Sequence, residues 1–201
     1  VSIIVIGNNQ HIELESVDRT DISLNKEFVD LINNVSKVSK KTIVVIMAGS
    51  CVDVSKFEEN VNAIVYAGFG GNGVLKGLAN LLVGRFNFSG KLSETFINKI
   101  EDISNYNNRG NSFCEVYNDR VFVGYRYYDS NKICVKYPFG YGLSYTEFSM
   151  YGAGVSVEGT KVHLKATVTN TGATYSGKEI AQVYVSAPSG KLEKEYQTLA
   201  A

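Results

Sequence analysis

Four ionisable side chains lie close together in one short loop near the start of the chain: Glu13, Glu15, Asp18 and Arg19. A carboxyl group can give a proton to a leaving group and later take one from water, so this loop carries the groups for general acid–base catalysis. An adjacent guanidinium lowers the pKa of a carboxyl group, whereas a general acid at neutral pH needs a raised pKa. We therefore expect Asp18 and Arg19 to pair or to brace the loop. We expect Glu15 or Glu13 to carry out the proton transfer.

The element that positions this loop is an apolar run at residues 3–6, which ends in Gly7. A continuous β-branched run of this kind is typical of a strand buried in a parallel sheet. Similar runs at 42–48 and 62–67, with helical periodicity between the first two, indicate a parallel crossover. Ligands of open α/β sheets bind at the carboxyl ends of the strands, where this loop begins. The fold class is therefore α/β, with a mostly parallel sheet flanked by helices.

Two helices are predicted from their end residues and their periodicity. Asn25 is a good N-cap, and Glu27 lies in the first turn that follows. The second helix covers residues 75–82 and ends at Gly84, a natural C′ position. The apolar face of the first helix is expected at Phe28, Leu31, Ile32, Val35 and Val38.

Four segments of the chain, in order, carry a resemblance to a known family. Residues 15–19 read Glu-Ser-Val-Asp-Arg, against a usual Glu-Gly-x-Asp-Arg. Residues 87–96 are similar to Asn-Pro-Ser-Gly-Lys-Leu-Pro-x-Thr-Phe, and 121–128 and 137–148 are similar to two Tyr/Gly-rich segments. Together they resemble the second catalytic domain of the family-3 glycoside hydrolases, which include β-glucosidases and β-xylosidases. That domain is part of an α/β sandwich.

The resemblance implies a retaining β-glycosidase that acts on β-glucosides or β-linked oligosaccharides without a cofactor or metal. Such an enzyme needs two carboxyl groups about 5–5.5 Å apart, one as nucleophile and one as acid/base. In the family, the nucleophilic aspartate belongs to a separate barrel domain, and the acid/base glutamate comes from this domain's loop. The matching residue is Glu15, with Glu13 as the alternative because a mobile loop can present either carboxylate. Arg126 is a weaker candidate for substrate binding.

Several departures from the family pattern favour a different function. Residues 71–75 align with Gly-Gln-Glu-Gly-Gly but lack the glutamate, and Asn25, Phe88 and Ser93 stand where the family has proline. Ser16 replaces a glycine, and glycine often marks a backbone conformation that other residues adopt at a cost. The alternative is a non-catalytic carbohydrate-binding or interaction module that kept the fold and lost the site.

The second half of the chain changes character. Residues 121–128 are expected to form an aromatic strand, and alternation of period two then predicts antiparallel strands at 162–170 and 179–185. This pattern resembles the start of the fibronectin-type-III-like module that ends many family-3 enzymes. We therefore expect an α/β domain with its Tyr/Gly-rich connection at 1–148 and an incomplete all-β domain at 149–201. The remaining strands would come from absent chain, because two strands alone are marginally stable.

Composition argues against several other classes of protein. Lys+Arg 20 and Asp+Glu 20 give a formal net charge of zero without a basic run, so nucleic acid is a poor partner. The apolar runs are far shorter than the roughly 20 residues that cross a bilayer. Residues 68–73 do not give Gly-x-Gly-x-x-Gly in any register, which argues against a dinucleotide site.

Cysteine usage and the chain ends complete the expectations. Cys51, Cys114 and Cys134 are odd in number and widely spaced, so we expect free thiols and a cytoplasmic location. The chain opens in the middle of a strand, so we expect a piece of a longer protein whose barrel domain is absent here. That piece should be inactive alone. The sequence leaves homo-oligomerisation open.

Overall fold

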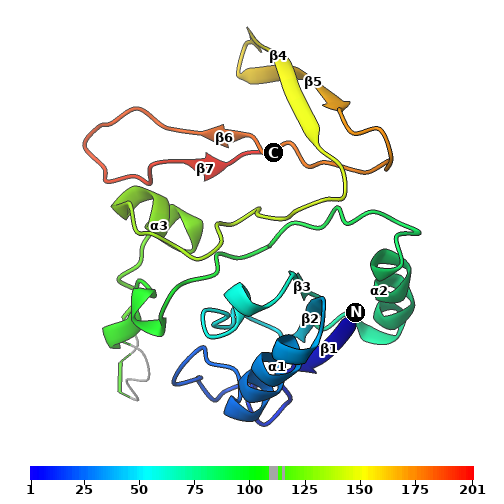
Figure 1. Ribbon diagram of the computed structural model, residues 1–201. Coiled ribbons are helices and arrows are strands. Elements are labelled where there is room, and N and C mark those ends of the chain that lie inside the picture. Colours follow the sequence, from blue (N-terminus) through cyan, green and yellow to red (C-terminus); the bar gives the residue numbers. More distant parts are fainter. Residues whose placement is uncertain (109–112, 115) are drawn as a thin grey trace.

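Three parallel strands form the sheet in the first third of the chain: β1 (Ser2–Gly7), β2 (Thr42–Met47) and β3 (Ala63–Tyr66), in the order β1-β2-β3. The computed structural model describes residues 1–108, 113–114 and 116–201 (Figure 1). Ser2 pairs with Thr42 and Ile43 with Ala63, so the carboxyl ends of the strands lie at one edge. The predicted parallel strands are confirmed.

One face of the sheet is buried and helix α1 (Lys26–Val38) covers it. Ile4 and Ile6 point to that face and join one core with Val29 and Ile32 of the helix. Side chains of a strand alternate between faces, so Ile3 points the other way and is exposed. The core extends to segments outside the sheet, including residues 96–100.

The start of α1 is confirmed, and its predicted face needs a correction. The Asn25 side chain accepts a hydrogen bond from the backbone N–H of Glu27 at 3.1 Å, as expected for an N-cap. The buried side chains are Val29 and Ile32, whereas Leu31 is half exposed. Val38, the last residue of the helix, is also exposed. Phe28 and Val35 are half-buried against the same core, so the predicted face is confirmed at Phe28, Ile32 and Val35 and wrong at Leu31 and Val38.

The second helix, α2 (Val74–Leu82), follows a 3-10 turn at Gly71–Gly73. Gly84 has a φ of +74°, the left-handed conformation expected two residues beyond the helix. The predicted end is confirmed. Further 3-10 turns lie at Glu58–Asn60, Ile100–Asp102 and Tyr106–Asn108.

The prediction that residues 121–128 form an aromatic strand is wrong. The second half of this segment belongs to helix α3 (Tyr125–Asn131). The carbonyl of Gly124 accepts hydrogen bonds from the N–H groups of Tyr127 and Tyr128, which starts the helix. Tyr125 stacks on Phe139 with ring centroids 4.9 Å apart, and Tyr128 is buried in the core. Residues three apart share one helix face, so these contacts outweigh the strand propensity of aromatic side chains.

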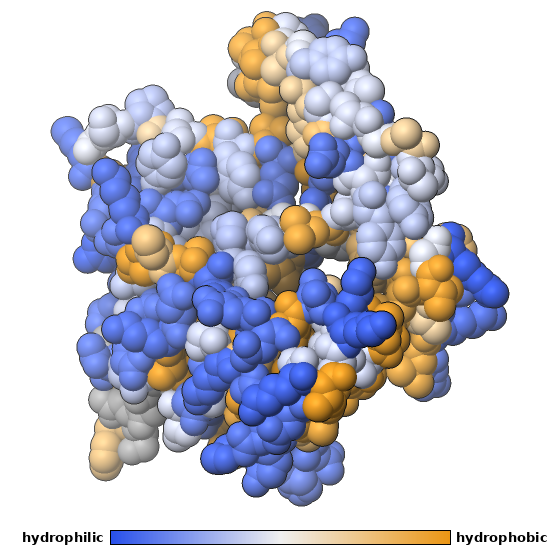
Figure 2. Space-filling model, in the orientation of Figure 1, coloured by the Kyte–Doolittle hydropathy of each residue, from blue (hydrophilic) through white to orange (hydrophobic). Residues whose placement is uncertain are grey.

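A long hairpin follows, made of β4 (Phe148–Glu158) and β5 (Lys161–Asn170). Gly159, with a φ of +58°, opens the two-residue connection that joins them. The predicted strand at 162–170 is therefore confirmed, but its partner β4 was missed. Figure 2 shows apolar side chains gathered on this hairpin, and Val155, Val157, Val162 and Leu164 are all exposed.

The predicted pairing of 162–170 with 179–185 is wrong. Asn170 accepts a hydrogen bond from Thr146 at 2.7 Å and donates one to the carbonyl of Tyr175 at 2.8 Å. These bonds turn the chain away from β5 and back towards the rest of the molecule. Of the predicted second strand only β6 (Tyr184–Val185) forms, and it pairs with β7 (Thr198–Leu199).

Candidate active site

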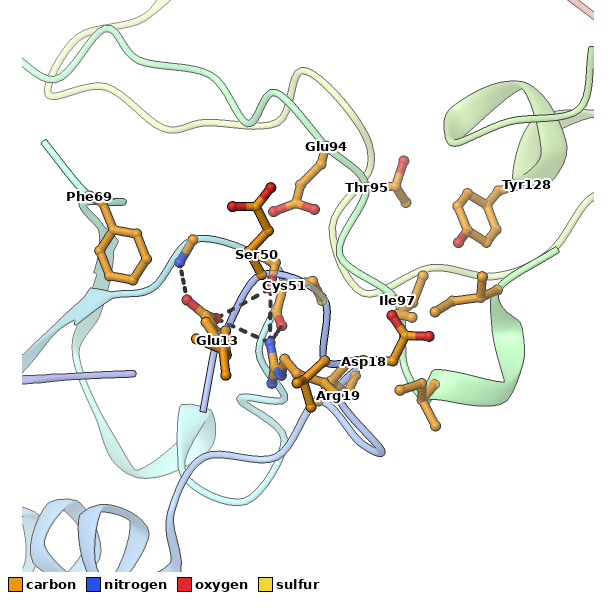
Figure 3. A pocket seen from close by; sticks show the side chains of 17 residues that line it. Glu13, Asp18, Arg19, Ser50, Cys51, Phe69, Glu94, Thr95, Ile97 and Tyr128 are labelled. Atoms are coloured by element: carbon orange, nitrogen blue, oxygen red, sulfur yellow. Dashed lines mark hydrogen bonds and ion pairs between the residues drawn. The ribbon is translucent and has the colours of Figure 1, made fainter. Parts of the chain in front are cut away.

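A cavity of about 500 Å³ lies beyond the carboxyl ends of the three parallel strands (Figure 3). The loop after β1, residues 49–51 after β2 and Phe69 after β3 form one side. Residues 94–103 and Tyr128 of α3 form the other side. Parallel strands bring their following loops to one edge, which is why segments so distant in sequence meet here. The cavity brings together all four loop candidates: Glu13, Glu15, Asp18 and Arg19.

Glu13 is held by hydrogen bonds on both of its carboxylate oxygens. Oε2 accepts from the backbone N–H of Gly49 at 2.7 Å, and Oε1 accepts from Nδ2 of Asn8 at 2.8 Å. Oε1 also accepts from Ser50 Oγ and from Arg19 Nη1, both at 3.3 Å. The side chain is 11% exposed. Its oxygens are thus occupied as acceptors within the wall of the cavity.

Arg19 ties the end of the same loop to the turn after β2. Its Nη1 donates to Ser50 Oγ at 2.9 Å and to the carbonyl of Cys51 at 3.1 Å, besides its ion pair with Glu13. Figure 3 shows Arg19 pointing toward Glu13 and Ser50. Arg19 forms an ion pair with Glu13, whereas the sequence led us to expect that Asp18 and Arg19 would pair or brace the loop.

Glu15 differs from Glu13 in its surroundings, although only one residue separates the two. It lines the cavity, is exposed, and makes no hydrogen bond or ion pair with the described part of the chain. Asp18 is also exposed on the cavity wall. A free carboxyl group on the wall of a cavity is available to an incoming molecule, whereas a fully bonded one is not.

Glu94 is a fifth ionisable residue of the cavity, and the sequence reading missed it. It stands within the segment 87–96, where it contributed only to a motif comparison. Burial raises the pKa of Glu94, and the negative charge of Glu13 raises it further. The Arg19 charge and a backbone hydrogen bond with Cys51 act in the opposite direction. Figure 3 shows Glu94 on the wall that faces Ser50 and Arg19.

Two other titratable groups near the cavity are kept neutral. Burial raises the pKa of the Cys51 thiol to about 12, so it is no nucleophile at neutral pH. Burial likewise raises the pKa of Tyr66 to about 12, and its hydroxyl donates to the carbonyl of Ala48 at 2.8 Å. Cys51, Cys114 and Cys134 are all free thiols, as predicted.

Arg126, the weaker binding candidate, lies on α3. Its Nε donates to the carbonyl of Val123 at 3.5 Å, and it lines neither the cavity described above nor the smaller one that Tyr125 and Phe139 line. In the part of the chain that the structure describes, no cluster of three His, Cys, Asp or Glu side chains suits a metal ion. None of the helices described there is both long and apolar enough to cross a bilayer.

Comparison with protein families gives one match that covers most of the chain. Residues 1–145 match the profile described as "Glycosyl hydrolase family 3 C-terminal domain". A β-glucosidase of Kluyveromyces marxianus is 36% identical over 199 residues, which are 98% of this chain and 23% of that protein. The thermostable β-glucosidase B of Acetivibrio thermocellus is 35% identical over 190 residues, 92% of this chain and 25% of that protein. The chain thus spans about a quarter of the length of these relatives.

Solved structures give a consistent result. The crystal structure of the Kluyveromyces marxianus β-glucosidase in complex with glucose matches with a TM-score of 0.91 and 35% identity, over 98% of this chain and 23% of that one. The Thermotoga neapolitana β-glucosidase 3B in complex with glucose matches with a TM-score of 0.86 and 34% identity, over 99% of this chain and 29% of that one.

Proposed function

The chain belongs to glycosyl hydrolase family 3, and from this we propose that it supplies the acid/base carboxyl group of a retaining β-glucosidase. The observation that carries the proposal is the placement of Glu15, a free and exposed carboxyl group on the wall of a cavity at the strand ends. The β-glucosidases that resemble this chain, two of them with glucose bound, support a β-glucoside as substrate.

In this proposal Glu15 acts twice. It first gives its proton to the glycosidic oxygen as the bond to the leaving group breaks. Its carboxylate then takes a proton from the water that attacks the glycosyl–enzyme intermediate. The nucleophile is an aspartate of a barrel domain that lies outside this chain. Glu15 is preferred to Glu13 because both oxygens of Glu13 already accept hydrogen bonds from the cavity wall.

The proposal also covers the domain boundaries and the role of Arg126. We propose that residues 1–148 form the α/β domain and that 149–201 begin a fibronectin-III-like domain. The exposed apolar hairpin of β4 and β5 supports the second assignment, since such a face needs covering. Arg126 stays the weaker binding candidate, because it would have to reach a substrate outside the cavity.

The test is the variant Glu15→Gln in the full-length enzyme. Hydrolysis of unactivated glucosides should fall by about 10²–10⁴-fold, the usual contribution of one general acid. Aryl glucosides with good leaving groups need no protonation, so their first step should survive, and added azide should yield β-glucosyl azide. The matched control is Glu59→Gln, an exposed glutamate outside the cavity, which should leave the rates unchanged. Normal turnover by Glu15→Gln would refute the assignment.

The alternative, a carbohydrate-binding or interaction module without catalysis, rests on the missing glutamate at residues 71–75 and on the three absent prolines. It is distinguished by the neighbouring coding sequence. A barrel domain with an aspartate nucleophile beside this segment favours the enzyme, and its absence favours the module.

A further inference from the structure

The loop that carries Glu15 is tied to the sheet by side chains rather than by its backbone. Within the described residues, the backbone hydrogen bonds of 9–19 stay inside the segment. The N–H groups of Ile12 and Glu13 donate to the carbonyl of Asn9, and that of Val17 donates to the carbonyl of Leu14. These bonds make two local turns that flank Glu15. They do not fix where the turns lie relative to the strands.

Arg19 attaches the end of the loop to the turn after β2, and Glu13 makes the attachment nearer to Glu15. Asn8 directly follows β1, and Gly49 and Ser50 follow β2. All three donate to the carboxylate of Glu13, so one side chain links the loop to the ends of two strands. Glu13 and Arg19 are only 11% and 15% exposed, and hydrogen bonds to charged groups are stronger where water is excluded.

Gly49, which donates to the carboxylate of Glu13, leaves space for this contact. A Cβ atom added at Gly49 would lie 3.1 Å from Oε2 of Glu13 and 2.8 Å from a ring carbon of Phe69. Gly49 does not have a positive φ, so the glycine is not required by the backbone. What it provides is room for the carboxylate to reach the backbone N–H at 2.7 Å.

From these contacts we propose that Glu13 is a positioning residue, which anchors the loop and so places the carboxyl group of Glu15 in the cavity. The inference rests on the proposed function of Glu15. Glu15 makes no hydrogen bond or ion pair with the described part of the chain, so we infer that its place depends on the anchor two residues before it. A displacement of about 1 Å in a catalytic group can cost 10²-fold in rate.

The experiment compares Glu13→Gln, Gly49→Ala and the double variant in the full-length enzyme. Glutamine can accept only on its single oxygen, so either the hydrogen bond from the Gly49 N–H or the three hydrogen bonds at Oε1 are lost or reversed. Alanine at 49 instead keeps the carboxylate but crowds the Phe69 ring at 2.8 Å and Oε2 of Glu13 at 3.1 Å, so Oε2 must shift away from the N–H by a few tenths of an ångström. Each single variant should lower kcat for glucosides by about 10- to 100-fold, with a smaller rise in KM. Because both changes release the same anchor, the double variant should be little slower than either single variant.

Azide separates anchoring from catalysis. Glu15 is still present in Glu13→Gln and Gly49→Ala, so neither should form β-glucosyl azide as Glu15→Gln does. Azide product from Glu13→Gln would overturn the proposal, since it would make Glu13 the acid/base. Unchanged kcat in both single variants, or a double variant as slow as the product of the two effects, would also overturn it. Should Glu13→Gln fail to fold, Gly49→Ala alone keeps the test decisive.

A failure of the underlying function has a different signature. Normal turnover by Glu15→Gln would remove the proposed role of Glu15, whatever Glu13 does. Slow turnover by Glu15→Gln together with normal turnover by Glu13→Gln and Gly49→Ala would remove only the anchor.

Discussion

Ser16 adopts a φ of +69°, a conformation that glycine takes freely and other residues take at a cost. The sequence reading raised this concern, because the family has glycine at this position. The residue lies next to Glu15, so the loop stores its strain beside the proposed catalytic group. Strain of this kind persists only where the surroundings hold the backbone in place.

We predict that Ser16→Gly stabilises the enzyme slightly. Relief of the left-handed conformation should raise the free energy of unfolding by about 1–2 kcal/mol. The greater freedom of glycine in the unfolded chain should lower it by about 0.5–1 kcal/mol. A small rise in the melting temperature of the full-length enzyme is therefore expected. Ser16→Ala is the control, because it removes the hydroxyl group and keeps the strain. Equal stabilisation by both variants would contradict the explanation.

Glu94 leads to a prediction about pH. Its folded pKa is raised above the ordinary 4.5 by burial and by Glu13, while Arg19 and a backbone hydrogen bond with Cys51 oppose the rise. In the window just above pH 4.5 the folded state therefore binds more protons than the unfolded state. The protonated carboxyl group of Glu94 therefore makes its full contribution to the free energy of unfolding below that window. This contribution is lost as the pH rises through the folded pKa.

Glu94→Gln removes this titration and keeps an oxygen that can accept from Cys51. The difference in melting temperature between the variant and the unaltered enzyme should increase in favour of the variant as the pH rises from 4 towards neutrality. It should then become constant. Melting curves across that range test the sign. Glu59→Gln, at an exposed glutamate, should follow the unaltered enzyme in parallel. A constant difference at every pH would exclude Glu94 as the source.

At the scale of elements, α1 shows how one capping side chain fixes where a helix begins. The oxygen of Asn25 accepts from the N–H of Glu27, which has no partner within the helix. Helix α1 in turn covers the buried face of the strands whose ends carry the cavity.

Asn25→Ala should therefore weaken the first turn of α1 by about 1 kcal/mol. Amide hydrogen exchange of the full-length enzyme provides a local measurement, and the N–H of Glu27 should exchange several-fold faster. Asn25→Asp keeps an acceptor and adds a charge that suits a helix N-terminus, so it should retain protection. Loss of protection in Asn25→Asp as well would show that the cap is not responsible.

For the whole molecule, the proposed function places the acid/base group on this chain and the nucleophile outside it. Retaining hydrolysis needs a nucleophile opposite the acid/base group. The chain also spans only about a quarter of the β-glucosidases that it resembles.

We accordingly predict that residues 1–201 alone do not hydrolyse p-nitrophenyl β-glucoside or β-xyloside, whereas the full-length enzyme hydrolyses the glucoside. A steady-state assay of both proteins is sufficient, with circular dichroism to check that the shorter chain is folded. Turnover by the 201-residue chain would mean that both catalytic groups lie within it, and it would remove the proposed division between two domains.

The sequence by itself determined the features that depend on neighbours along the chain. Runs of β-branched residues predicted β1, β2 and β3, Asn25 and Gly84 marked the helix ends, and the loop after Gly7 was singled out as a candidate site and lines the cavity. Each of these follows from backbone geometry over a few residues, so local patterns are sufficient to predict them.

Tertiary structure alone decided the features that depend on distant segments. It made a helix of Tyr125–Asn131, because Tyr125 and Tyr128 pack on partners that are not their sequence neighbours. It also brought Glu94 to the cavity. Glu13 and Glu15 look equivalent in sequence, and only the donors from Asn8, Gly49 and Ser50 make one of them an anchor and leave the other free. The physical reason is that hydrogen bonding and burial are set by contacts between chain segments, and local periodicity does not encode which segments meet.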